Sequence, residues 1–303
     1  MKKYTQADFD AFEVIDGIKQ CPSGDYSAIQ VFSDRCSFGE WCSFSESCSF
    51  GEGCSFGERC SFGEDCFFGA CCSFGEDCSF GERCSFGERC SFGERCSFGA
   101  CCSFGERCSF GEDCFFGACC SFGEDCSFGE RCSFGERCSF GERCSFGACC
   151  SFGERCSFGE DCFFGACCSF GEDCSFGERC SFGERCSFGE GCSFGGACSF
   201  GEWCSFGERC YFGECCSFGE RCSFEGKGEY IGDYPFLAFV GFGSRIGSKV
   251  YFFNLQDGIY VRCGCWLSDI AGFRERVKAE NADAMYLDLC DLVERKFNRK
   301  NSK

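Results

Sequence analysis

The sequence predicts a parallel β-solenoid built from 32 units of six residues, with a small α+β segment at its C-terminal end. Three observations predict it. From Cys36 to Cys222 a cysteine recurs at every sixth residue without a slip, and Phe is the third residue of every unit. The residues between them are mostly Ser, Gly and charged residues. A short period that persists over roughly 190 residues is typical of a solenoid and not of a compact globule.

Each unit separates an interior from an exterior. In the segment Cys-Ser-Phe, the Cys and Phe side chains share one face because side chains alternate along a strand. Gly-Glu-Arg or Gly-Glu-Asp then provides a turn, where we expect Gly to adopt the positive φ of the corner. We therefore expect a core of Phe and Cys, a phenylalanine ladder, inside an acidic surface of Ser, Glu, Asp and Arg.

The unit resembles the hexapeptide repeat of the left-handed parallel β-helix superfamily. In that family an aliphatic residue is followed by Gly, two variable residues, a small residue and another variable residue, and Phe-Gly-Glu-Arg-Cys-Ser fits. The resemblance covers residues 36–224 and implies triangular coils of eighteen residues, each made of three units. The enzymes of the family depend on His, which this chain lacks, so the resemblance implies a non-catalytic member.

A longer period leaves the size of the coil open. The segment at residues 66–72 returns at Cys114 and again at Cys162, a spacing of eight units. Coils of two units (twelve residues) or four units (twenty-four residues) would keep these segments on one face, whereas a triangular coil would rotate them onto different faces. Three Phe rings in each layer also make a crowded triangle. We expect the triangular coil of three units, with coils of two or four units as the alternatives.

The flanking segments differ in composition from the repeat and are predicted to cap its ends. Residues 1–35 are expected to form an N-terminal cap of a short helix and a strand, in which Thr5 caps the helix and Asp8 completes a capping box. Residues 36–224 form the β-helix. Residues 225–303 are expected to form a C-terminal α+β domain that protects the strand edges and offers a place for a protein partner or for self-association. Its predicted elements are strands at 236–241, 249–255 and 259–267, a helix at 271–280 capped by Ser268, and a helix at 282–297.

Composition argues against several classes of function. Without His there is no Ser-His-Asp triad, no Cys-His pair and no His ligand for a metal, so we expect no enzyme and no catalytic residues. The net charge of −19 lies almost entirely in the repeat and opposes binding to nucleic acid or to an anionic membrane. The N-terminus does not resemble a secretory signal, and no apolar run is long enough to span a membrane. We therefore expect a cytoplasmic protein with reduced thiols.

Most of the 42 cysteines fall into two groups. The inward cysteines are interpreted as small apolar filler, although a column of thiolates would also suit a soft metal such as zinc, Cu(I) or an iron–sulfur cluster. Six further cysteines take the turn position that Arg or Asp usually holds, and in five of them the preceding Glu is replaced by Ala. These six are the candidate metal ligands: Cys71, Cys101, Cys119, Cys149, Cys167 and Cys215.

The sequence thus favours a non-enzymatic structural protein or interaction scaffold without a cofactor. It is expected to act through protein partners or self-association, by the C-terminal domain or by the rod. The alternative is a thiol-rich metal-binding or redox protein that uses the cysteine ladder. In a coil of three units, Cys101 and Cys119 would lie one coil apart, as would Cys149 and Cys167.

Overall fold

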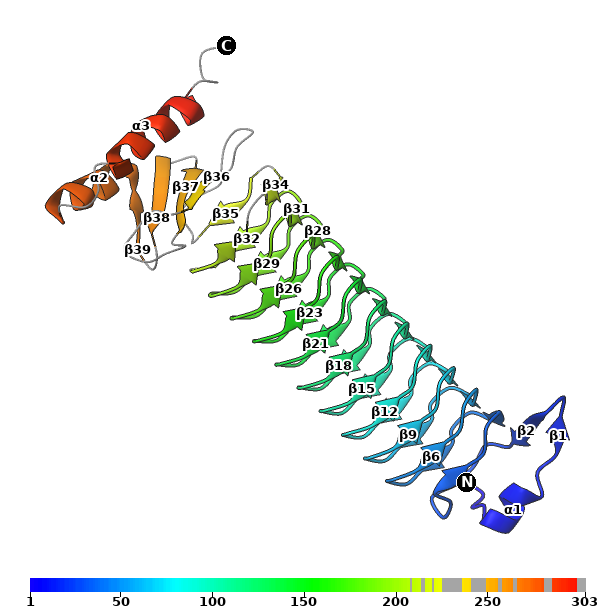
Figure 1. The fold of residues 1–303 in the computed structure, drawn as a ribbon. Helices are drawn as coiled ribbons and strands as arrows, with labels where there is room; N and C mark the ends of the chain where they lie inside the picture. The colour runs from blue at the N-terminus through cyan, green and yellow to red at the C-terminus, as the bar shows by residue number, and fades with distance from the viewer. Residues whose placement is uncertain are drawn as a thin grey trace.

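The central region of the chain is a rod of stacked coils, with a sheet and two helices at one end and a smaller cap at the other (Figure 1). This is a computed structural model, and it describes residues 1–207, 209–213, 216–219, 221–224, 236–240, 249–255, 258–263, 266–280 and 285–298. The predicted parallel β-solenoid with a small α+β C-terminal cap is confirmed. The division into domains at residues 35 and 224 stays a prediction. None of the described helices is long and apolar enough to cross a bilayer.

Three long sheets form the sides of the rod. The first sheet runs in the order β1 (Val14–Ile15), β2 (Ile18–Cys21), β4 (Cys36–Phe38), β7 (Ser55–Phe56), β10 (Ser73–Phe74), β13 (Ser91–Phe92), β16 (Ser109–Phe110), β19 (Ser127–Phe128), β22 (Ser145–Phe146), β25 (Phe163–Phe164), β28 (Ser181–Phe182), β31 (Ser199–Phe200) and β34 (Ser217–Phe218). The second sheet runs in the order β35 (Ser223–Phe224), β32 (Ser205–Phe206), β29 (Ser187–Phe188), β26 (Ser169–Phe170), β23 (Ser151–Phe152), β20 (Ser133–Phe134), β17 (Phe115–Phe116), β14 (Ser97–Phe98), β11 (Ser79–Phe80), β8 (Ser61–Phe62) and β5 (Ser43–Phe44). The third sheet runs in the order β3 (Val31–Phe32), β6 (Ser49–Phe50), β9 (Phe67–Phe68), β12 (Ser85–Phe86), β15 (Ser103–Phe104), β18 (Ser121–Phe122), β21 (Ser139–Phe140), β24 (Ser157–Phe158), β27 (Ser175–Phe176), β30 (Ser193–Phe194) and β33 (Tyr211–Phe212).

The register of these sheets fixes the coil at three units. Ser73 of β10 pairs in parallel with Ser91 of β13, and the same offset of eighteen positions recurs along all three sheets. The coil is therefore triangular, and the alternatives of two and four units are wrong. As a triangular coil requires, the repeats at a spacing of eight units fall on different sides, because β9, β17 and β25 belong to three different sheets.

Three columns of Phe rings fill the interior. Along each column the rings stack with centroids 4.8 Å apart and planes nearly parallel, as for Phe74 and Phe92. Within a coil the rings meet edge to face, with centroids 5.0 Å apart between Phe74 and Phe80. Both offset-stacked and edge-to-face contacts are favourable for aromatic quadrupoles. Three Phe rings therefore fit into each triangular layer, although the sequence suggested that they would be crowded.

The inward cysteines form three further columns between the Phe columns. Most of these buried thiols donate to the glycine carbonyl 21 residues earlier, for example from Cys78 Sγ to the Gly57 carbonyl oxygen at 3.5 Å. Contact with the Cys126 thiol in the next coil, together with burial, raises the pKa of Cys108 to about 12. The core thiols thus donate to carbonyl groups of the neighbouring coil.

The glycine of each unit has a different role from the one expected. The residue with positive φ is the one two positions later, usually Arg, Asp or Cys, as at Arg59 with φ 58°. The glycine itself is needed because the preceding coil passes close by: a Cβ at Gly75 would lie 2.8 Å from the Gly57 carbonyl carbon. The expectation that this Gly adopts the positive φ is therefore wrong, since close approach of backbones, and not turn conformation, excludes a side chain.

The N-terminal cap covers the first coil. Helix α1 (Gln6–Asp10) begins after Thr5, whose hydroxyl accepts from the Asp8 amide while the Asp8 carboxylate accepts from the Thr5 amide. The predicted capping box is therefore confirmed. Phe9 packs edge to face on Phe32, and β1 and β2 form an antiparallel hairpin whose second strand leads into the first sheet.

The C-terminal sheet packs on the other end of the rod. Its antiparallel order is β36 (Phe236–Val240), β37 (Lys249–Leu255), β38 (Gly258–Cys263) and β39 (Trp266–Asp269). Tyr251 and Phe253 join the core of the solenoid, and the Tyr251 hydroxyl donates to the Phe212 carbonyl oxygen at 2.7 Å. Val250 and Phe252 belong instead to a second core, together with the helices α2 (Ile270–Ala279) and α3 (Met285–Asn298).

Two details of this region differ from the prediction. The strand expected at 259–267 is two antiparallel strands, β38 and β39, whose register pairs Cys263 with Trp266. The N-cap of α2 is Asp269 and not Ser268, since the Asp269 carboxylate accepts from the Gly272 amide at 2.7 Å.

Candidate thiol site

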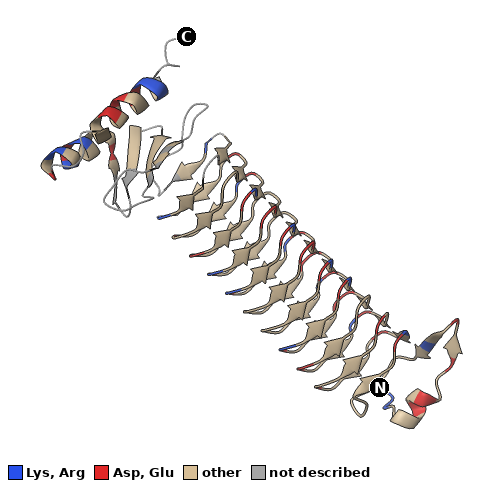
Figure 2. Ribbon diagram, in the orientation of Figure 1, with Lys and Arg blue, Asp and Glu red and all other residues tan. Residues whose placement is uncertain are grey.

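The turns of the rod stack into columns along its edges. The amide of each turn residue donates to a carbonyl of the next coil, as from Arg59 to the Glu76 carbonyl oxygen at 2.9 Å. Turn residues one coil apart in sequence therefore lie above one another, and their side chains project into solvent. Figure 2 shows the charged residues of the repeat concentrated in these turns, while its short strands carry none.

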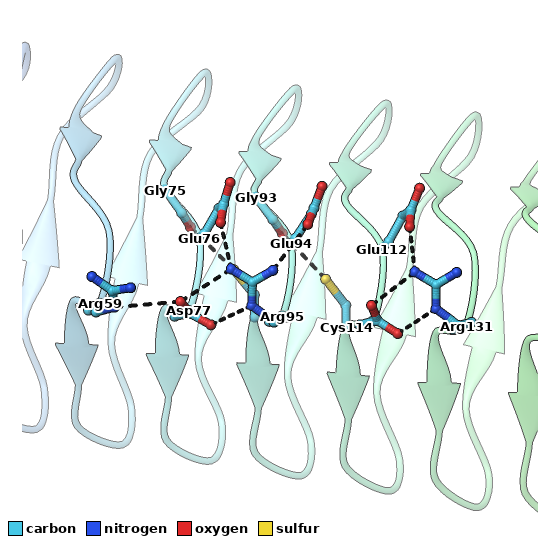
Figure 3. A network of polar contacts seen from close by, with 12 residues as sticks. Arg59, Gly75, Glu76, Asp77, Gly93, Glu94, Arg95, Glu112, Cys114 and Arg131 are labelled. Atoms are coloured by element: carbon cyan, nitrogen blue, oxygen red, sulfur yellow. Dashed lines mark hydrogen bonds and ion pairs between the residues drawn. The ribbon is translucent and has the colours of Figure 1, made fainter.

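Arg and Asp alternate in parts of these columns and form ion-pair ladders. Arg95 donates to Asp77 at 2.8 Å and to Glu76 at 2.6 Å, and Asp77 also faces Arg59 at 3.6 Å (Figure 3). The hydrogen bonds from Arg95 lower the pKa of Asp77 below its usual value. The same Asp-to-Arg step over one coil recurs at Arg83, Arg131, Arg143 and Arg179.

The turn cysteines interrupt these ladders. Five of the six predicted candidates lie at exposed turn positions with φ near 60°, namely Cys71, Cys101, Cys119, Cys149 and Cys167. Cys215 lies outside the described residues. The five replace the Arg or Asp of the ladder, and the Ala before each replaces a Glu.

Four of the five form two stacked pairs. Cys101 lies one coil before Cys119, and its amide donates to the Ala118 carbonyl oxygen at 2.9 Å. Cys149 and Cys167 repeat this arrangement, with the Cys149 amide 2.8 Å from the Ala166 carbonyl oxygen. Desolvation and the facing Cys167 thiol raise the pKa of Cys149. Cys71 has no such partner, because Gly53 and Arg89 occupy its column on either side.

Each pair lies beside an apolar ring and a guanidinium. Phe115 and Phe163, on the strands that lead to Cys119 and Cys167, point outward and are more than half exposed. Arg137 and Arg185 follow one coil later in the two columns. In the part of the chain that the structure describes, neither has an ion-pair partner, because the position that holds Asp elsewhere in the ladder is Cys here.

The comparison with protein families gives one result. Eight segments match the model of an RNA-binding, Nab2-type zinc finger: residues 31–45, 84–99, 101–117, 118–135, 132–147, 149–165, 168–189 and 192–207. Together they cover less than half of the chain. No curated protein and no solved structure matches the chain.

This match corrects several expectations from the sequence. The family whose model matches is a zinc finger and not the hexapeptide-repeat superfamily, which corrects the resemblance to that superfamily. The match also overturns the interpretation as a structural protein and the expectation of no nucleic-acid partner. The expectation of no cofactor conflicts with a zinc-binding family. The matched segment 84–99 contains three closely spaced cysteines, Cys84, Cys90 and Cys96, which the sequence favours as core filler with a soft-metal site as the alternative.

The ligand set of such a zinc finger does not fit the folded chain. Cys84, Cys90 and Cys96 precede strands of three different sheets, and each is buried, with its thiol donating to a different glycine carbonyl. Phe rings of the same coil fill the interior between them, and the sequence contains no His. Among the described residues no group of three His, Cys, Asp or Glu side chains is placed to hold a metal ion.

Sequence reasoning found the turn cysteines and their offset of one coil, but missed what surrounds them. The lack of an acidic partner for Arg137 and Arg185 among the described residues becomes visible only when the column of stacked turns is known. The exposure of Phe115 could have been predicted from the sequence, because Phe115 takes the outward position that Ser holds in most units.

Proposed function

We propose that the chain is a cytoplasmic, non-enzymatic protein that binds soft metal ions through the two stacked pairs of exposed cysteines. The observation that carries this proposal is the pairing of Cys101 with Cys119 and of Cys149 with Cys167 on the surface of a rigid rod. Thiolates select soft ions such as Cu(I) and zinc. The family match supports a metal-binding role, although its own ligand set is not the one proposed.

The chemistry of a pair favours Cu(I). Two thiolates from neighbouring coils complete a linear, two-coordinate site, whereas zinc takes four ligands and would need two from outside the chain. The neighbouring Ala side chains leave room for an ion above the turn. Arg137 and Arg185 compensate the negative charge that a bis-thiolate complex of a monovalent cation carries.

Anaerobic metal titration tests this proposal. We expect reduced protein to bind about two Cu(I) ions in competition with a chelator, because each pair supplies one two-thiolate site. Cys119→Ser should remove one ion, and Cys119→Ser combined with Cys167→Ser should remove both.

Cys71→Ser is the matched control, because Cys71 is an exposed turn cysteine without a stacked cysteine in its column. Serine already occupies this turn position at Ser47, with φ 59°, so the substitutions suit the backbone. An unchanged stoichiometry in the double variant, or an equal loss with Cys71→Ser, would show that the pairs are not the sites.

RNA binding is the second candidate, and the family match favours it. The net charge of −19 opposes it, so phosphate contacts would have to be local. Three arginines lie one coil after a turn cysteine and form no ion pair among the described residues: Arg89, Arg137 and Arg185.

We expect that any binding of single-stranded RNA weakens with salt and is lost when these three arginines become Gln. Fluorescence anisotropy with a labelled oligonucleotide measures it. Arg95→Gln, which removes an arginine already held by Asp77 and Glu76, is the control. Binding that is equal in both variants would exclude these arginines as the interface.

A further inference from the structure

The two cysteine pairs have the geometry of a closable dithiol. Neighbouring parallel strands are about 4.8 Å apart, within the range of roughly 4.4–6.8 Å between the Cα atoms of a disulfide. The members of each pair share one backbone conformation, with φ 61° at both Cys101 and Cys119 and φ 60° at both Cys149 and Cys167. Their Cα–Cβ bonds therefore point the same way from adjacent coils, which places the two thiol side chains next to each other on one edge of the rod. Closing the bridge requires only that the two Cβ atoms approach from this coil spacing to the roughly 3.5–4.5 Å of a disulfide.

The surroundings of the pairs suit an anionic reagent. At most other turns a Glu precedes the turn residue and would repel an approaching anion, although Ala70 precedes Cys71. At the pairs this position is Ala100, Ala118, Ala148 or Ala166. One coil beyond each pair lies the guanidinium group of Arg137 or Arg185. Among the described residues, no carboxylate forms an ion pair with either group.

We infer that Cys101 with Cys119, and Cys149 with Cys167, are redox-active dithiols that small anionic disulfides of the glutathione type oxidise to disulfides between coils. Arg137 and Arg185 attract the carboxylates of the reagent. The bridge itself needs no metal. Its consequence, that oxidation removes both thiolate ligands and releases a bound ion, rests on the proposed function.

The reaction balances as two thiol–disulfide exchanges. One cysteine thiolate attacks a sulfur of the reagent, which forms a mixed disulfide and releases one small thiolate. The second cysteine thiolate attacks the protein sulfur of the mixed disulfide, closes the bridge and releases the other small thiolate. The protein loses two electrons, the reagent gains them, and the two cysteine protons end on the two released thiols.

Oxidation of metal-free protein tests the inference. After treatment with glutathione disulfide, native alkylation and peptide mass analysis should show that the four paired thiols no longer react and carry no added glutathione, since both pairs have closed. Cys71 should instead carry one glutathionyl group, the other half of the reagent leaving as glutathione, because no cysteine stacks beside it. Cys119→Ser should prevent one bridge and leave Cys101 as a mixed disulfide.

A variant of Arg137 separates the attraction of the anionic reagent from the closeness of the two thiols. Arg137→Glu should slow closure of the pair Cys101–Cys119 by glutathione disulfide by about threefold or more, while closure by the neutral hydroxyethyl disulfide is unchanged. Mixed disulfides at all five exposed cysteines, without bridges, would overturn the inference. Because no metal is present, this failure is distinct from failure of metal binding by the reduced protein.

Discussion

Phe116→Ala is expected to destabilise the rod by about 3–5 kcal/mol, the range found when a fully buried Phe is truncated in a core. Phe116 is 0% exposed and stacks on Phe98 and Phe134 at 4.9 and 4.8 Å. It also meets Phe110 and Phe122 edge to face at 5.0 and 5.1 Å. Truncation leaves a cavity that the flanking coils cannot close, because their spacing is fixed by backbone hydrogen bonds.

The adjacent residue of the same strand supplies the control. Phe115 is 55% exposed and takes the outward position that Ser holds in most units, so Phe115→Ser restores the common repeat. We expect its free energy of unfolding to change by less than about 0.5 kcal/mol. Chemical denaturation monitored by circular dichroism compares the two variants.

The nearest-neighbour character of a solenoid adds a local readout. Because each coil contacts only its neighbours, the loss at Phe116 should raise amide exchange most in the coils next to β17. Equal destabilisation by Phe115→Ser and Phe116→Ala would contradict the inward-facing Phe columns. Uniform exchange along the whole rod would contradict the local coupling.

The fold was predictable because one rule is repeated many times. Alternation in Cys-Ser-Phe assigns the two faces of a strand, and a period without slips leaves room for one architecture only. The size of the coil was less certain, because the longer period of eight units fits coils of two or four units better than a coil of three. Only the pairing of Ser73 with Ser91, which depends on how three Phe rings pack, decides it.

The site was predictable in part. The replacement of Glu-Arg by Ala-Cys marked the turn cysteines, and their offset gave the pairs. The loss of an acidic partner at Arg137 follows from a contact across coils that no local pattern contains. The role of glycine was misjudged for the same reason, since the atom that excludes its side chain belongs to a different coil.

That close approach between coils gives the second large effect. Gly147→Ala is expected to cost about 3 kcal/mol, at the upper end of the usual cost of overpacking. A Cβ at Gly147 would lie 2.6 Å from both the Glu130 amide nitrogen and the Gly129 carbonyl carbon. These are backbone atoms of the neighbouring coil, so no side chain can rotate away, and relief requires that the two coils separate.

Gly53→Ala separates this steric effect from the loss of glycine itself. Gly53 has φ +65°, and a Cβ there would meet nothing closer than Arg35 Cγ at 3.8 Å. Gly53→Ala should lower the free energy of unfolding by about 1 kcal/mol, the cost of placing a side chain in the left-handed conformation. Most turn residues of the rod already adopt this conformation. Denaturation midpoints of the two variants measure the difference. If Gly53→Ala proves the more damaging, the left-handed turn conformation outweighs the approach of neighbouring coils, because both substitutions add the same methyl group, one at a left-handed turn with open space around it and the other against the backbone of the neighbouring coil.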